Sequence, residues 1–77
     1  MMLYIVKIKV DYFHENGVEH HTDEVVVRTI DSAMQIIADS KEKAKKFDDW
    51  MRGASIYTTT WKNDVLVKDE CVYEEGK

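Results

Sequence analysis

The sequence contains no proline, and it has only one cysteine and three glycines among its 77 residues. A single cysteine, Cys71, excludes an intramolecular disulfide, and we therefore expect a reducing compartment, the cytoplasm. Three glycines leave little material for a glycine-rich phosphate loop. Paired catalytic carboxylates, a nucleophile triad and zinc-type cysteine spacing are also missing, so we expect no enzymatic activity and no cofactor.

Long hydrophobic runs are missing as well. Lysines interrupt the apolar residues 1–9 before such a run develops, so we expect neither a signal peptide nor a membrane span here. Fifteen acidic residues against eleven basic ones give a net charge of −4, which disfavours nonspecific adhesion to DNA or anionic membranes. A membrane is therefore not an expected partner.

The apolar material that the sequence does contain is sufficient for a core. Hydrophobic residues make up 44% of the chain, and they include two tryptophans, four tyrosines and two phenylalanines. We expect one small globular domain over residues 1–77. Because a domain of this size buries only about 60% of its unfolded surface, its stability must come from packing.

Residues 3–10 and 25–30 have the composition of two strands, and we predict a hairpin with Asn16 and Gly17 as its two-residue turn. That turn sets Ile8 opposite Val25 and Lys9 opposite Glu24. One face of the hairpin then becomes apolar. Its members are Tyr4, Val6, Ile8, Val10, Val25 and Val27.

A helix is predicted over residues 32–51. Ser32 and Gln35 have the spacing of a capping box, and Gly53 suits a left-handed cap after the last turn. One apolar stripe recurs at steps of three and four: Ala33, Ile37, Ser40, Ala44, Phe47 and Met51. Asp39 and Ser40 offer an alternative break into two helices, but the stripe stays in phase across them and favours one helix.

Residues 55–62 and 65–73 are rich in β-formers and predict a second hairpin. A three-residue turn at residues 62–64 would place its apolar side chains on one core face, namely Tyr57, Trp61, Val65, Val67, Cys71 and Tyr73. A two-residue turn would divide them between the two faces. We expect the three-residue turn, and with it a packed Cys71 thiol.

The predicted fold class is α+β with the element order ββαββ. One helix packs on one face of a four-stranded, mainly antiparallel sheet. Two strand orders, 2-1-3-4 and 2-1-4-3, satisfy the rule that the crossover is right-handed. The other face of the sheet is left uncovered by this arrangement.

We expect the function to be binding to another protein, because a domain this small acts through its surface. An inhibitor of the phage or mobile-element type, which blocks a host complex by occupying its surface, fits this size and acidity. A second copy of the chain is an alternative partner. The candidate contact residues are three aromatics and four carboxylates that could imitate a row of phosphates: Trp50, Tyr57, Trp61, Asp69, Glu70, Glu74 and Glu75.

A second hypothesis is binding of single-stranded nucleic acid. Basic residues flank the predicted helical stripe and could grip phosphates: Lys41, Lys43, Lys45, Lys46 and Arg52. Trp50 could stack on an unpaired base. The net negative charge argues against this hypothesis.

A third hypothesis is a metal site at the tip of the first hairpin. The candidate ligands are His14, His21, Glu19 and Asp23, whose nitrogen and oxygen donors suit zinc or nickel. Their spacing matches no known ligand motif, and a hairpin tip is a poor support for a metal. A solvated polar tip is the simpler interpretation.

Overall fold

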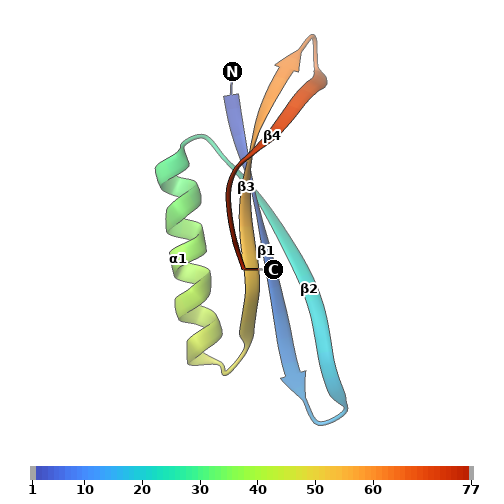
Figure 1. Ribbon diagram of the computed structural model, residues 1–77, viewed down its shortest axis with the longest axis vertical. Helices are drawn as coiled ribbons and strands as arrows, with labels where there is room; N and C mark the ends of the chain where they lie inside the picture. The colour runs from blue at the N-terminus through green and yellow to red at the C-terminus, as the bar shows by residue number, and fades with distance from the viewer. Residues whose placement is uncertain (1, 77) are drawn as a thin grey trace.

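The computed structural model describes residues 2–76, which form four strands and one helix (Figure 1). The elements are β1 (Met2–His14), β2 (Gly17–Val27), α1 (Ile30–Lys46), β3 (Trp50–Lys62) and β4 (Val65–Gly76). All pairings are antiparallel, and the strand order is β2-β1-β3-β4, the first of the two predicted alternatives. The predicted α+β class is confirmed.

The helix begins earlier and ends earlier than the sequence predicts. Thr29, not Ser32, is the N-cap, and its side chain accepts a hydrogen bond from the Ser32 amide. The helix stops at Lys46 because Asp48 adopts a left-handed φ of 56°, after which the chain turns into β3. The predicted extension to Met51 and the cap at Gly53 are therefore wrong, since both residues belong to β3.

Asp39 and Ser40 do not break the helix. The Asp39 carboxylate accepts a 2.8 Å hydrogen bond from the Gln35 side chain one turn earlier, so it does not compete for the backbone. Ala33, Ile37 and Ala44 are buried, whereas Phe47, at the C-cap, is exposed. The predicted stripe is confirmed up to Ala44 and lost beyond it.

The first hairpin forms with a register different from the predicted one. Its turn residues are Glu15 and Asn16, because His14 pairs with Gly17, which has a φ of 133°. Ile8 therefore faces Asp23 rather than Val25. The correction moves β2 by two residues, and since side chains alternate with a period of two, the apolar face survives unchanged.

The second hairpin has a two-residue turn, and the predicted three-residue turn is wrong. Asn63 and Asp64 both adopt positive φ values, 51° and 65°, a conformation that these two residue types tolerate. Register shifts near Val67 and Val72 then place one extra residue in β4 at each point. Each bulge changes which face the following residues occupy.

The core lies between α1 and the central strands β1 and β3. Its buried members are Val6, Ile8, Val10, Ala33, Ile37, Ala54 and Ile56. A 17-residue helix is about 25 Å long, whereas a 13-residue strand reaches about 43 Å. The helix therefore covers only part of the sheet, and both hairpin tips extend beyond it in a particle of 48 × 23 × 18 Å (Figure 1).

Candidate protein-binding face

The side of the sheet opposite α1 carries residues from all four strands. On β1, Val6, Ile8 and Val10 face the helix. The intervening residues and their cross-strand partners lie on the other side, which we call the open face. On β1 these residues are Leu3, Ile5, Lys7, Lys9, Asp11 and Phe13.

Three aromatic residues proposed as contacts lie on the open face, and this corrects the predicted placement of Tyr57 and Trp61 on a core face. Trp50 pairs with Asp11, and Tyr57 pairs with Ile5. The Trp61 indole donates a 3.0 Å hydrogen bond to Thr59 two residues earlier on the same side of β3. Trp50 is 57% exposed and Trp61 is 46% exposed, so neither belongs to the core.

An apolar row crosses the middle of the open face. Val26, Ile5, Tyr57 and Cys71 occupy successive strands at directly paired positions. Val26 is 58% exposed, and Cys71 is also exposed, which contradicts the packed thiol that we expected. The cause is the bulge near Val72, which turns Tyr73 toward the core and leaves Cys71 on the open face.

A charged row lies directly beside the apolar row. It consists of the charged residues Glu24, Lys7 and Glu74 and the polar Ser55 on the four strands. The Lys7 ammonium is 3.7 Å from the Glu24 carboxylate and 4.9 Å from the centre of the Tyr57 ring. Lys7 therefore connects the two rows.

A shallow groove of about 320 Å³ follows next to the charged row. It forms where Gly53 pairs with Gly76, because neither residue has a side chain to fill the space. A Cβ atom on Gly76 would lie 2.1 Å from the Arg52 carbonyl oxygen, so this close approach requires glycine. Lys7 and Lys9 line the other side of the groove.

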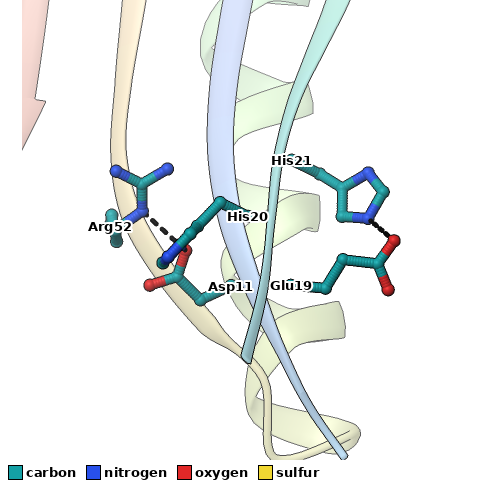
Figure 2. Close-up of polar contacts among 5 residues, drawn as sticks. All are labelled: Asp11, Glu19, His20, His21 and Arg52. Atoms are coloured by element: carbon teal, nitrogen blue, oxygen red, sulfur yellow. Dashed lines mark hydrogen bonds and ion pairs between the residues drawn. The ribbon is translucent and has the colours of Figure 1, made fainter. Parts of the chain in front are cut away.

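Asp11 is a buried carboxylate, with only 2% of the residue exposed. Figure 2 shows it between His20 of β2 and Arg52 of β3. Its Oδ1 atom accepts a 2.7 Å hydrogen bond from Arg52 Nε and lies 2.6 Å from His20 Nδ1. Three strands are thus joined through one oxygen atom.

The electrostatics of this group indicate a structural role. Burial raises the pKa of the Asp11 carboxyl, but the hydrogen bonds and the electrostatic attraction from His20 and Arg52 together lower it by more, so the pKa lies below the ordinary value of 3.8. Asp11 is therefore ionised at neutral pH and held by a fixed cation. A carboxylate satisfied in this way stabilises the lower end of the open face and is not suited to proton transfer.

Exposed apolar side chains gather at both hairpin tips. Phe13 pairs with Val18 at the first tip, two residues along β1 from the Asp11–Trp50 pair. Trp61 pairs with Leu66 at the second tip, and both are exposed. The open face therefore presents apolar groups at its middle and at its two ends.

The four carboxylates proposed as a phosphate-like row do not form one. Asp69 and Glu74 pair with Thr59 and Ser55 on the open face, whereas Glu70 and Glu75 pair with residues of the helix side. Glu75 is bound to Lys41 at 2.7 Å and to the Tyr73 hydroxyl. The bond to Lys41 fastens the end of β4 to α1, whereas the bond to Tyr73 lies within β4.

The charges around Glu75 perturb one another. The hydrogen bond from Lys41, followed by that from Tyr73, lowers the pKa of Glu75 below 4.5. The same hydrogen bonds raise the pKa of Lys41 above 10.5 and that of Tyr73 above 10.0. All three groups favour the states they hold at neutral pH.

The basic residues proposed to grip phosphates are separated. Lys43, Lys45 and Lys46 lie in the last turn of α1, while Lys41 is engaged with Glu75. Arg52 belongs to β3 and bonds to Asp11. Because the helix ends at Lys46, the predicted flanks do not continue to Trp50, which lies on the opposite side of the sheet.

The histidine cluster is also divided. Glu19 lies 2.8 Å from His21 and 3.9 Å from His14, whereas His20 turns to Asp11 (Figure 2). Asp23 pairs with Ile8 and lines a separate small cavity against α1. Within residues 2–76, no group of three or more histidine, cysteine or acidic side chains is arranged to hold a metal ion.

One residue of this face, Asp11, was not identified from the sequence, and Arg52 was proposed for a different role, as a phosphate contact. Asp11 reads as an exposed charge on the polar side of β1, and Arg52 reads as the end of a helix. The bulge between Lys9 and Val10 in the β1–β3 pairing brings Arg52 to Asp11, and bulges leave little sequence signal. Only the proximity of Gly53 hinted at an irregular strand.

The helix α1 is too short and too polar to cross a membrane, and it is the one helix that the structure describes. Comparison of the chain with protein-family models, with curated proteins and with solved structures gave no match.

Proposed function

We propose that this chain is a non-catalytic protein-binding module and that its contact surface is the open face. The proposal is carried by one observation: Trp50, Tyr57 and Trp61 all lie on that face, although they are spread along the full length of β3. Aromatic residues are enriched at protein interfaces, and tryptophan and tyrosine are frequent energetic anchors. The two tryptophans are about half exposed and therefore available for contact.

The order of the rows defines the chemistry of the partner. A partner surface should be apolar where it meets Val26, Ile5, Tyr57 and Cys71. It should carry polar groups of both signs where it meets Lys7 and Glu74, because an unpaired charge at an interface is costly. A folded protein surface fits this alternation better than a nucleic acid, whose backbone is uniformly anionic.

In its finer form, we propose an inhibitor of the phage or mobile-element type that acts in the cytoplasm by occupying a working surface of another complex. Small size, an uncovered aromatic face and a net charge of −4 support this form. An exposed thiol at Cys71 also suits a reducing compartment. Imitation of nucleic acid has less support, because the four C-terminal carboxylates are divided between two faces.

Affinity capture with matched variants tests the proposal. The tagged protein, a Trp50→Ala/Trp61→Ala variant and a Met34→Ala control on the helix are each incubated with the same host lysate. We expect a stoichiometric protein that is retained by the first and third proteins and lost by the double variant. Equal retention by all three folded proteins, or retention of no protein, would contradict the proposal.

A further inference from the structure

The β2 strand forms an uninterrupted outer edge of the sheet (Figure 1). It pairs with β1 from Val27 to Gly17 without a bulge, and its other side has no neighbouring strand among residues 2–76. An unbulged edge presents unpaired N–H and C=O groups and is a template for pairing with another strand. Val18 and Val26, near its two ends, are both exposed.

The turn geometry determines which residues point outward along this edge. His14 and Gly17 close a two-residue turn, so they form a hydrogen-bonded pair. Hydrogen-bonded pairs alternate along an antiparallel ladder, and every second residue of β2 therefore turns its backbone groups away from β1. The outward residues are Val18, His20, Thr22, Glu24 and Val26.

In an antiparallel pair of two identical strands, these outward residues would meet residues of complementary type. We infer that β2 pairs with β2 of a second copy of this chain, antiparallel and centred on Thr22. In that register His20 meets Glu24 of the other copy, and Val18 meets its Val26. On the other face, His21 meets Asp23, whereas Glu19 meets Val25.

Neighbouring registers are less favourable. The outward N–H and C=O groups of one copy can bond only to the outward groups of the other. The allowed registers are therefore those that keep outward residues opposite one another. The next register in one direction sets His21 against its own copy, and the next in the other direction sets Asp23 against its own copy. Like residues then replace the imidazole–carboxylate pairs at the centre.

The other edge of the sheet is protected against such pairing. The β4 strand carries bulges near Val67 and Val72, which interrupt a regular ladder. Its central residues Asp69 and Glu70 would also bring acidic side chains together in a self-paired edge. The two edges thus differ: β2 has no bulge, and its acidic residues Asp23 and Glu24 face histidines in the proposed register.

The assembly would be an eight-stranded sheet with a twofold axis perpendicular to it at Thr22. Both open faces then lie on the same side and form one continuous surface. This inference goes beyond the proposed function, since it uses the edge of β2 and none of the three aromatic anchors. The variants of the capture experiment leave that edge intact, so the two proposals can fail separately.

Light scattering or sedimentation equilibrium measures the mass directly. At about 100 µM we expect a mass rising from 9.0 kDa toward twice that value, because a one-strand interface is small and micromolar affinity is expected. Thr22→Pro removes an outward N–H without touching the β1 ladder and should weaken association about tenfold or more. Thr22→Val is the matched control and should remain dimeric. A constant mass of 9.0 kDa, or equal association of the two variants, would overturn the inference.

Oxidative cross-linking tests the register. In a Cys71→Ser background, Thr22→Cys places two thiols at directly paired positions about 5.5 Å apart at Cα, within reach of a disulfide. Glu24→Cys is the control, because its two copies would lie four residues apart, about 13 Å. We expect rapid covalent dimer only with Thr22→Cys. Equal cross-linking of both variants would exclude this register.

Discussion

The two hairpins of this molecule differ in the regularity of their strand pairing. The β1–β2 ladder is regular from the turn to its far end, whereas β4 accommodates two bulges against β3. In the first hairpin the correction of the register by two residues changed no face. In the second, one extra residue near Val72 was enough to move Cys71 and Tyr73 to opposite sides. A shift of the register by an even number of residues therefore leaves every side chain on its face. A shift by one residue moves the side chains to the other face.

The turns show a related contrast. The first turn relies on Gly17 at a φ of 133°, which side-chain-bearing residues rarely adopt. The second turn uses Asn63 and Asp64 in the left-handed region, which these residues enter at a modest cost. The first turn is therefore intolerant of substitution, and the second can be improved.

The largest effect is expected where the hairpins meet. Val6 and Ile56 pair directly across β1 and β3, and both are fully buried. Ile56→Ala should lower the free energy of unfolding by about 2–5 kcal/mol, because it leaves a cavity under the helix. Urea denaturation measures the loss. Val72→Ala, at an exposed bulge, is the control and should change stability by at most about 0.5 kcal/mol. Equal losses would mean that the core is not where we place it.

The next largest effect is a loss of stability on substitution in the first turn. Gly17→Ala should cost about 1–3 kcal/mol, since alanine at this φ is strained. Thermal or urea unfolding provides the measurement, and Glu15→Ala in the same turn serves as the control. A neutral Gly17→Ala substitution would show that the first turn adopts another conformation.

A smaller, pH-dependent effect is expected at the end of β4. Glu75→Gln should cost about 1 kcal/mol at neutral pH, because it weakens the bonds to Lys41 and Tyr73. The pKa of Glu75 is lowered, so its stabilisation is present above pH 4.5 and is lost as the pH falls through its folded value. The raised pKa values of Tyr73 and Lys41 give stabilisation that is present below about pH 10 and is lost above it.

The measurement is the difference in unfolding free energy between wild type and Glu75→Gln across this pH range. It should be largest between pH 4.5 and pH 10 and should shrink on both sides. The acid response of Asp11 is common to both proteins and cancels in the difference. A difference independent of pH would show that Glu75 is not bonded as described.

The smallest effect is a gain at the second turn. Asp64→Gly should stabilise the hairpin by about 0.5 kcal/mol, because relief of the left-handed strain slightly exceeds the added entropy of the unfolded chain. The midpoint of urea unfolding should rise slightly. A clear loss of stability would indicate that the Asp64 side chain makes a contact that the turn requires.

Alternation of apolar and polar residues along β1 predicted the apolar face of the first hairpin, and the predicted helix and second hairpin completed the fold class. It could not predict where a strand begins after a helix, because Trp50 and Met51 fit the helical spacing as well as they fit a strand. Nor could it locate bulges, whose extra residue depends on tertiary contacts such as Arg52 with Asp11.

The candidate site shows the same limit. Trp50, Tyr57 and Trp61 were selected as aromatics that a small domain cannot hide, and that argument depends on size alone. The side of the sheet that they occupy depends on whether a bulge has shifted the alternation of side chains along the strand. The acidic and basic sets were chosen from spacing along the sequence, and the sheet distributes them over two sides.

The mismatch in length between α1 and the strands has a consequence for solution experiments. The radius of gyration is 14.1 Å, whereas a compact domain of 77 residues would have about 11 Å. A rod-like monomer of this kind diffuses more slowly than a sphere of equal mass and leaves a sizing column early. An elution volume alone would therefore imitate association, and it cannot substitute for a direct determination of molecular weight.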